Sequence, residues 1–221
     1  MDSYIDKISF CIQKGKIDSK SPYPPEMKGE PGADELTMEA LRDGLNANDI
    51  LTKAMIPAMG VVGELFKEKK LFVPQVLMSA KAMSSAMHHL KPYFASGELK
   101  QKGLFIVGTV AGDLHDIGKN LVSMMIEGSG WSVMDLGVDV KSEQFIEAIR
   151  DNPGSVLGMS ALLTTTMESM ERSVREIKSI YPQQKIIVGG APLSSDFAKR
   201  IGADFYAQNP QTAVEYLGNI K

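Results

Sequence analysis

Five short apolar runs alternate with amphipathic segments from Gly103 to the end of the chain, and this alternation limits the possible folds most strongly. The apolar runs are Leu104–Val110, Ser132–Leu136, Val156–Met159, Lys185–Val188 and Ala203–Tyr206. The segments that follow them have helical spacing, at about 116–129, 142–151, 167–180, 194–201 and 210–219. Repeated β–α units are typical of a parallel sheet with helices on both faces. We therefore expect a five-stranded parallel α/β domain, flavodoxin-like or Rossmann-like, over residues 103–221.

The first half of the chain has a helical pattern instead. Apolar residues recur at helical spacing through residues 34–95, which predicts a bundle of helices. Asn46 has a short polar side chain suited to capping the second helix, and Pro92 is expected to end the third. A linker is expected at 96–102. The predicted helical runs are Leu36–Leu45, Met55–Phe66 and Val73–Tyr93.

Residues 1–33 form a separate N-terminal segment in this interpretation. A short helix is expected first, and an irregular connection over residues 15–33 follows it. Clustered prolines and glycines between Ser21 and Gly32 disfavour regular structure there. The connection either wraps the helical bundle or contacts a partner, and the residues alone do not decide between these two roles.

Charge and cysteine content exclude several classes of protein. The net charge of −3 argues against a nucleic-acid partner, which usually requires a basic face. A single cysteine, Cys11, excludes an intramolecular disulfide and a multi-thiolate zinc site, and it fits a reducing compartment. The N-terminus lacks the pattern of a signal peptide, and no run approaches the roughly 18 apolar residues of a membrane span. We expect a cytoplasmic protein that binds neither nucleic acid nor membrane.

Ligands of open α/β sheets bind at the carboxyl ends of the strands, so the loops there are candidate sites. Asp113 and His115 lie in the first loop, and a carboxylate beside an imidazole fixes its tautomer, as in metal-binding histidines. Taken alone, the pair also fits a structural hydrogen bond, and Gly189-Gly190 fits an ordinary turn. His88 and His89 are expected to face solvent rather than to bind a ligand. The loops are Gly112–Asn120, Ser160–Thr166, Gly189–Ala191 and Gln208–Asn209.

The spacing of three motifs in these loops resembles the cobalamin-binding signature. The motifs are Asp113-x-His115-x-x-Gly118, then Ser160-x-Leu162 after 41 residues, then Gly189-Gly190 after a further 26 residues. This form is found in the cobalamin module of methionine synthase and in corrinoid proteins of methyltransferase systems. The stretch from Met59 to Met83 is likewise similar to the helical cap that precedes that module.

The resemblance implies a role for each matched residue. Cobalamin would be bound base-off, with its benzimidazole detached from cobalt and His115 as the lower axial ligand of the metal. Asp113 would accept a hydrogen bond from His115, and Thr166, where methionine synthase has serine, would extend that relay. The residues expected along the nucleotide tail of the cofactor are Gly118, Ser160, Leu162, Gly189, Gly190, Tyr206, Gln208 and Asn209.

The resemblance also implies a function, that of a corrinoid methyl carrier cycling between methylcobalamin and the Co(I) corrinoid. A substrate-specific methyltransferase would load the methyl group, a second methyltransferase would pass it to a thiol or tetrahydrofolate, and a reductive activase would restore the cofactor. The chain is too short to include a catalytic barrel of about 250 residues, so we expect a subunit without catalytic residues of its own. Methylamines, methanol, betaine and aryl methyl ethers in O-demethylation systems all remain possible donors.

Two other functions share the histidine signature. The cobalamin subunit of an adenosylcobalamin mutase generally lacks the helical cap. A cobalamin-dependent sensor carries a tryptophan above the cofactor and usually a DNA-binding domain. The one tryptophan here, Trp131, is predicted at the start of a strand, and no basic DNA-binding segment is present.

Overall fold

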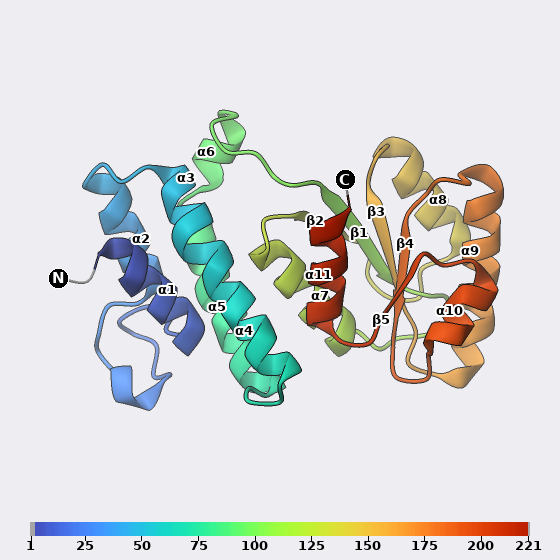
Figure 1. Ribbon diagram of the computed structural model, residues 1–221, viewed down its shortest axis with the longest axis horizontal. Helices are drawn as coiled ribbons and strands as arrows, with labels where there is room; N and C mark the ends of the chain where they lie inside the picture. The colour runs from blue at the N-terminus through green and yellow to red at the C-terminus, as the bar shows by residue number, and fades with distance from the viewer. Residues whose placement is uncertain (1–2, 221) are drawn as a thin grey trace. The chain divides into compact units, whose positions relative to one another are not determined.

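The computed structural model describes residues 3–220, which divide into two compact units. The first unit contains residues 3–101 together with 128–130 and is helical. The second contains residues 102–127 and 131–220 and is built around a sheet. This confirms the predicted fold class, a helical bundle followed by a parallel α/β domain (Figure 1).

Residues 3–220 form one five-stranded parallel sheet with the strand order β2-β1-β3-β4-β5. The register places Val107 of β1 opposite Asp135 of β2 and Gly158 of β3. The three inner strands are largely buried, which explains why their sequences are nearly continuous apolar runs. The strands are β1 (Leu104–Thr109), β2 (Ser132–Asp135), β3 (Val156–Ser160), β4 (Ile186–Gly189) and β5 (Phe205–Ala207).

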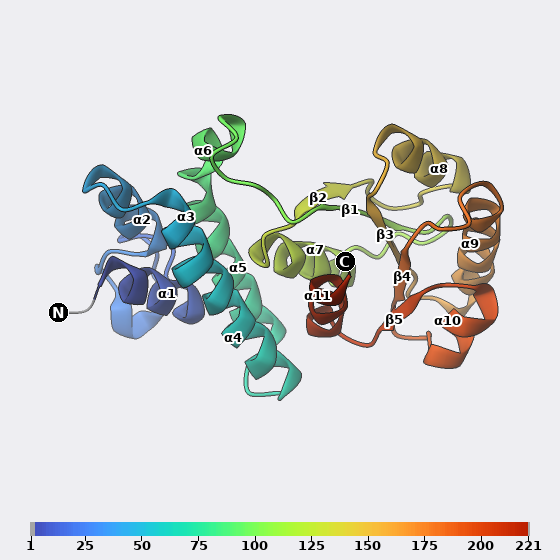
Figure 2. The ribbon, with the colours of Figure 1, turned by 45° about the horizontal axis from the view of Figure 1, so that its top comes forward.

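Helices cover both faces of the sheet, with α7 and α11 on one face and α8, α9 and α10 on the other (Figures 1 and 2). The ring of Phe145 from α8 packs so closely on β1 that a Cβ at Gly108 would lie 2.8 Å from it. These helices are α7 (Ile117–Gly128), α8 (Ser142–Asp151), α9 (Met167–Ile180), α10 (Ser195–Ile201) and α11 (Pro210–Asn219). A short 3₁₀ turn, η3 (Thr164–Thr166), precedes α9.

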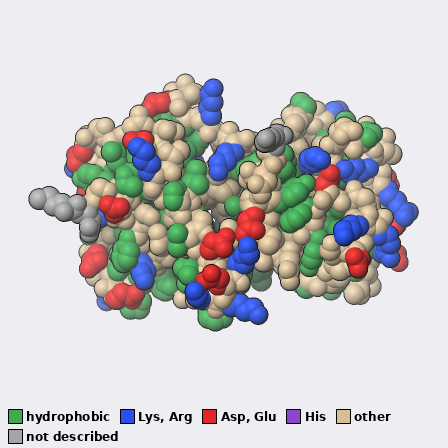
Figure 3. Space-filling model, viewed as in Figure 1, with side chains coloured by type: hydrophobic (Ala, Val, Ile, Leu, Met, Phe, Trp, Pro, Cys, Tyr) green, Lys and Arg blue, Asp and Glu red, His purple; other side chains and the backbone are tan. Residues whose placement is uncertain are grey.

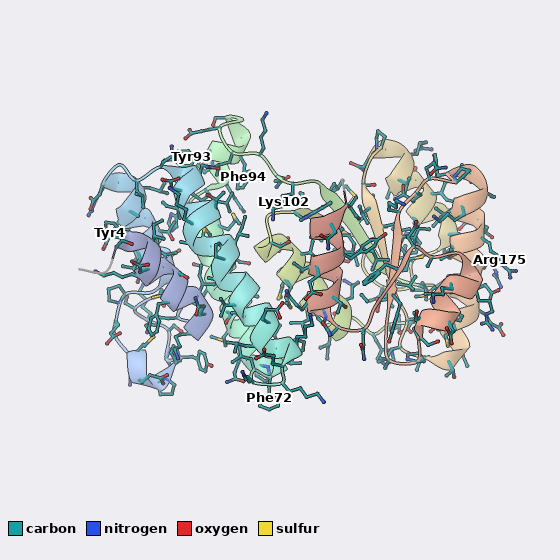
Figure 4. The ribbon with its side chains drawn as sticks, viewed as in Figure 1. Tyr4, Phe72, Tyr93, Phe94, Lys102 and Arg175 are labelled. Atoms are coloured by element: carbon teal, nitrogen blue, oxygen red, sulfur yellow. The ribbon has the colours of Figure 1, made fainter. Side chains whose placement is uncertain are left out.

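The helical unit is held together by apolar contacts between α1, α2, α4 and α5. The Tyr4 hydroxyl on α1, labelled in Figure 4, donates to Asp43 Oδ2 at the end of α2 at 2.7 Å. Phe72, at the turn before α5, is instead 65% exposed. The elements are α1 (Tyr4–Lys14), η1 (Pro25–Met27), α2 (Ala33–Arg42), α3 (Ala47–Asp49), η2 (Ile50–Met55), α4 (Ile56–Lys67), α5 (Val73–His88) and α6 (Lys91–Ala95).

Two prolines shape the helices in ways that the periodicity did not predict. Asn46 caps the second helix as expected: its side chain accepts from the N–H of Asn48 at 2.8 Å at the start of α3, which continues through η2 into α4. The π-helical stretch η2 lies just before Pro57, whose ring would collide with the carbonyl four residues earlier in a regular α-helix. Pro92 does not end the third helix. α5 stops at His88, and Pro92 lies in the first turn of α6, where a missing N–H has no cost.

The irregular connection after α1 folds back onto its own unit. Its two ends are joined by backbone bonds from Ala33 N to Lys16 O at 3.0 Å and from Asp34 N to Ile17 O at 2.9 Å. Gly32 is pressed against the Ile17 backbone at this point, and the Lys16 side chain is fully buried with its Nζ donating to Ser21 O. The structure therefore shows the connection folded back against α1 and the start of α2 in its own unit.

The two histidines at the end of α5 differ in their surroundings. His88 is exposed, as expected. His89 is not simply solvent-facing, because its Nε2 lies 3.0 Å from Asp34 Oδ1 at the start of α2. Over the face shown in Figure 3, Lys and Arg side chains are scattered among Asp and Glu side chains. Within residues 3–220, no helix has both the length and the apolar character needed to cross a membrane.

The packing at Gly32 predicts that Gly32→Ala destabilises the helical unit. A Cβ there would overlap the backbone of Ile17 and Asp18, so we expect the free energy of unfolding to fall by about 2–3 kcal/mol. Gly60→Ala is the matched control, since Gly60 lies in α4 with no atom within 4 Å of its Cβ position, and it should be neutral or stabilising by up to about 1 kcal/mol. Chemical unfolding measures both variants, and equal stability of the two would contradict the close contact.

Candidate functional site

A cavity of about 610 Å³ opens at the carboxyl edge of the sheet and extends between the sheet and helices α7 and α11. The loop after β1 and the first turn of α7 form one wall, and the chain after β5 forms the opposite wall. The ends of β3 and β4 lie between them. This is the edge at which ligands of open α/β sheets bind.

The structure brings the residues singled out in the sequence together at this cavity. Asp113 and Thr166 do not line it and lie instead behind His115, buried from solvent. Tyr206, expected along the same path, also lines the cavity. The other singled-out residues that line it are His115, Gly118, Ser160, Leu162, Gly189, Gly190, Gln208 and Asn209.

The Asp113 carboxylate is completely buried and accepts hydrogen bonds through both oxygens. Its Oδ1 accepts from the His115 ring Nδ1 at 2.7 Å and from the His115 backbone N–H at 3.1 Å. Its Oδ2 accepts from the Leu162 N–H at 2.7 Å, from the Leu163 N–H at 3.3 Å and from the Thr166 hydroxyl at 2.8 Å. The carboxylate therefore joins the loop after β1 to the loop after β3.

These bonds set the charge of the site. Burial by itself would raise the pKa of Asp113, because it disfavours the ionised form. The bonds from Leu162, His115 and Thr166 outweigh burial and hold the pKa of Asp113 well below its usual range. A buried anion consequently stands behind the imidazole at every physiological pH.

His115 presents one ring nitrogen to the cavity. Nδ1 faces Asp113, which requires that Nδ1 carry the proton it donates to the carboxylate, so Nε2 has a free lone pair in the neutral ring. Among the described residues, Nε2 has no hydrogen-bond partner, and the side chain is 51% exposed. The end of β1 also holds the loop that carries His115, because the Thr109 hydroxyl donates to His115 O at 2.9 Å. A neutral imidazole held in this way can offer Nε2 to a metal.

Exposed apolar side chains gather in and beside the loop that carries His115. They come from the loops that follow β1, β2 and β3, three neighbouring strands at one edge of the sheet. Large apolar side chains gathered at one solvent-facing site indicate a surface that a ligand or partner covers. The residues of this apolar rim are Leu114, Ile117, Val138, Leu162 and Leu163.

Glycines keep the cavity open. A Cβ at Gly118, in the first turn of α7, would meet no protein atom within 4 Å and would project from a cavity-lining position. Gly190 has φ +136°, and a Cβ there would overlap the Ala161 carbonyl, so only glycine fits. A Cβ at Gly189 would lie 3.3 Å from Ala207 O. The protein needs glycine at 190 for its own packing, whereas its packing does not require glycine at 118.

Several supporting groups escaped the sequence analysis. The backbone N–H groups of Leu162 and Leu163 bind Asp113, and every non-proline residue has such a group, so no sequence signal marks them. Asp139, with φ +55°, accepts from the Gly112 N–H at 2.7 Å and so holds the other end of the histidine loop. Lys119 is buried beside the cavity, and its Nζ is bonded to Asp135 and Asn120. Its burial could not be predicted, because a lysine in the first turn of a helix is usually exposed.

Within residues 3–220 the structure shows neither a further metal-binding cluster nor an activated cysteine thiol. No group of three or more His, Cys, Asp or Glu side chains among them could hold a metal ion. Cys11 is buried in the helical unit, where burial raises the pKa of its thiol to about 11. A thiol with that pKa is a poor nucleophile at neutral pH.

Comparison with known proteins places this site in a family. A family model described as a B12 binding domain matches residues 103–215, and a second model with the same description matches residues 29–91. A corrinoid protein of Desulfitobacterium hafniense (strain Y51) is 37% identical over 191 residues, which are 84% of this chain and 88% of that protein. Monomethylamine corrinoid protein 2 of Methanosarcina acetivorans is 41% identical over 197 residues, 86% of this chain and 90% of that protein.

A solved structure is similar over the whole chain. It is the crystal structure of the methanol:cobalamin methyltransferase complex of Methanosarcina barkeri, in which one chain superposes with a TM-score of 0.77 at 28% identity. The match covers 100% of this chain and 81% of that chain. The sheet domain and the helical bundle therefore occur together in that relative also.

The buried carboxylate predicts that Asp113→Asn is strongly destabilising even without a ligand. An amide has one oxygen and one NH₂ group, so donors on one side of the side chain lose their acceptor, and we expect a loss of about 3 kcal/mol in the free energy of unfolding. Asp116→Asn, in the same loop but exposed, is the matched control and should change that free energy by less than about 0.5 kcal/mol.

The difference in stability between wild type and Asp113→Asn should also depend on pH. Because the pKa of Asp113 is lower in the folded than in the unfolded chain, its stabilisation is complete above the unfolded value of about 3.9 and declines as the pH falls below it. The stability difference between wild type and Asp113→Asn should therefore shrink as the pH falls from about 4 to about 2. A difference that stays the same over that acid range would contradict a depressed pKa.

Proposed function

Because this chain belongs to the family of B12-binding corrinoid proteins and has cobalamin as its cofactor, we propose that it is a methyl carrier that binds cobalamin base-off, with His115 Nε2 as the nitrogen ligand of cobalt. The observation that carries this proposal is the histidine itself. Its Nδ1 is bound to a buried carboxylate, and its Nε2 has no partner among the described residues, in a ring that lines the cavity.

The residues around the cavity fit the parts of the cofactor. The apolar rim would contact the face of the corrin ring around His115. The open space at Gly118 and the cavity beyond Ser160, Gly189 and Gly190 would receive the nucleotide tail. Gln208 and Asn209 would lie beside it on the opposite wall. When bound, cobalamin supplies a cobalt centre that accepts a methyl group and gives it up again.

Asp113 and Thr166 would control the proton on His115. While Nε2 donates its lone pair to a metal, the Nδ1 proton remains hydrogen-bonded to Asp113 and increases the basicity of the ring. When Nε2 is released it can take up a proton, and the buried Asp113 anion stabilises the resulting imidazolium. The Thr166 hydroxyl, 2.8 Å from Asp113 Oδ2, shares that charge. The relay therefore tunes how readily the histidine binds and leaves the metal.

The methyl group would come from and go to partner enzymes. We propose that a substrate-specific methyltransferase loads it, that a second methyltransferase transfers it to a thiol or tetrahydrofolate, and that a reductive activase repairs the carrier. The similar chain in the methanol:cobalamin methyltransferase complex supports the first partner. The names of the relatives favour a small donor of the methylamine or methanol type.

The helical unit favours this carrier role over a mutase subunit. A B12-binding family model matches residues 29–91 within it, and monomethylamine corrinoid protein 2 is similar over 86% of this chain. The chain thus has the two-domain organisation of the corrinoid proteins, a helical unit and a sheet unit, and is not a sheet domain alone.

Removal of the proposed ligand should change the cofactor's spectrum. We expect wild type reconstituted with hydroxocobalamin to show base-off, histidine-ligated absorption, and His115→Ala to show a different base-off spectrum with roughly tenfold weaker binding. His88→Ala, an exposed histidine of the helical unit, is the control and should match wild type. Identical spectra of wild type and His115→Ala would rule out His115 as the ligand.

Filling the space at Gly118 should block cobalamin without harming the fold. Gly118→Leu places a side chain in the cavity, and we expect cobalamin affinity to fall at least roughly 100-fold because overlap with a ligand cannot relax. The melting temperature of the free protein should stay equal or rise, since leucine favours helix over glycine by up to about 1 kcal/mol.

Gly218→Leu is the matched control for Gly118→Leu. Gly218 is an exposed glycine in α11, also has no atom within 4 Å of its Cβ position, and lies outside the cavity lining. Cobalamin binding by this variant should equal that of wild type. Normal binding by Gly118→Leu would show that the nucleotide tail lies elsewhere.

A further inference from the structure

The cavity has a polar rim and an apolar interior. Its polar side chains lie at or near the carboxyl edge of the sheet, among them His115, Lys119, Ser160, Gln208 and Asn209. The side chains that line its interior are apolar, among them Phe105, Val107, Val122, Ile187 and Ala213. Val107 precedes Thr109 by two residues, so the interior extends at least about 7 Å below the edge at about 3.3 Å per residue.

The backbone adds little polarity to this interior. Val107, Gly158 and Ile187 are direct neighbours across β1, β3 and β4, and each of these strands has a partner strand on both sides. Their N–H and C=O groups are therefore used by the ladders of the sheet. The backbones of α7 and α11, which cover this face, are likewise bonded within the helices. A ligand group in the interior meets carbon almost everywhere.

Phe105 forms part of the inner end of the cavity. Its ring lies over Gly158 on the neighbouring strand, where a Cβ would overlap the ring. Gly158 thus makes room for the end of the ring, and the ring adds an aromatic group to the lining of the interior. An aromatic ring at this place favours a flat aromatic ligand group through stacking or edge contacts.

We propose that this apolar interior selects the nucleotide base at the end of the cofactor's tail, accepting benzimidazole and disfavouring a purine that carries an amino group. The proposal rests on the proposed function, which brings the tail into this cavity. Benzimidazole has a hydrocarbon ring that loses little on leaving water. The exocyclic amine and ring nitrogens of adenine would lose their water partners and find few replacements beside Val107 and Ile187.

The test compares ligands that differ in the tail. The full-length protein free of cofactor is titrated with aquacobalamin, with its analogue bearing adenine as the lower base, and with cobinamide, which lacks the nucleotide. Binding is followed by absorbance. We expect cobalamin to bind roughly 10- to 100-fold more tightly than the adenine analogue, and cobinamide to bind more weakly than cobalamin. Equal affinities for cobalamin and the adenine analogue would overturn the proposal, as would equal affinities for cobalamin and cobinamide.

A matched pair of variants tests whether the lining causes the preference. Val107→Thr adds a hydroxyl inside the cavity without changing side-chain size, and it should lower the preference for cobalamin at least roughly threefold. Val156→Thr makes the same change in the same buried cluster but outside the cavity lining, and it should leave the preference unchanged. An unaltered preference in folded Val107→Thr would overturn the role of this lining, and the wild-type ratio decides if that variant does not fold.

The outcomes separate this proposal from the proposed function. If cobalamin itself is not bound, the carrier function fails. If cobalamin and the adenine analogue both bind with the same affinity and the same histidine-dependent spectrum, the carrier function stands and only the base selection fails.

Discussion

The Asp113 carboxylate connects the ends of two neighbouring strands to the histidine between them. One oxygen accepts from the backbone and ring of His115, and the other accepts from the loop after β3. Because the charge is fully buried, each lost bond would leave part of it without compensation. The imidazole therefore cannot turn without disturbing β3, and the direction of Nε2 depends on the register in which β1 and β3 pair.

Much of the fold could be predicted from the order of apolar runs. The bounds of α8, α9 and α11 agree with the prediction because each helix has a clear amphipathic period closed by turn residues. The π-helical stretch before Pro57 could not be predicted, since the distortion depends on how the chain accommodates one missing N–H. The path of residues 15–32 was equally hidden, because it depends on contacts between backbone groups far apart in sequence, such as Ala33 with Lys16.

The site was predictable to the extent that side-chain chemistry marks it. The spacing of His115, Ser160 and Gly189 places all three in loops at one edge once the strands are assigned, and the structure gathers them at one cavity. The backbone donors of the loop after β3 and the brace from Asp139 carry no comparable mark. The apolar interior was also missed, because Val107 and Ile187 have the same pattern as residues of any buried strand.

The strand order places all of the cavity's loops at the carboxyl edge, and the described turns at the amino edge of the sheet are not part of the cavity lining. The turns there, near Gly154 and Gln183, connect a helix to the next strand and lie outside the cavity. Evolution can lengthen, shorten or recharge these turns without altering the cofactor's surroundings. Related chains are thus free to acquire new docking surfaces at one end of the domain while the chemistry at the other end is inherited unchanged.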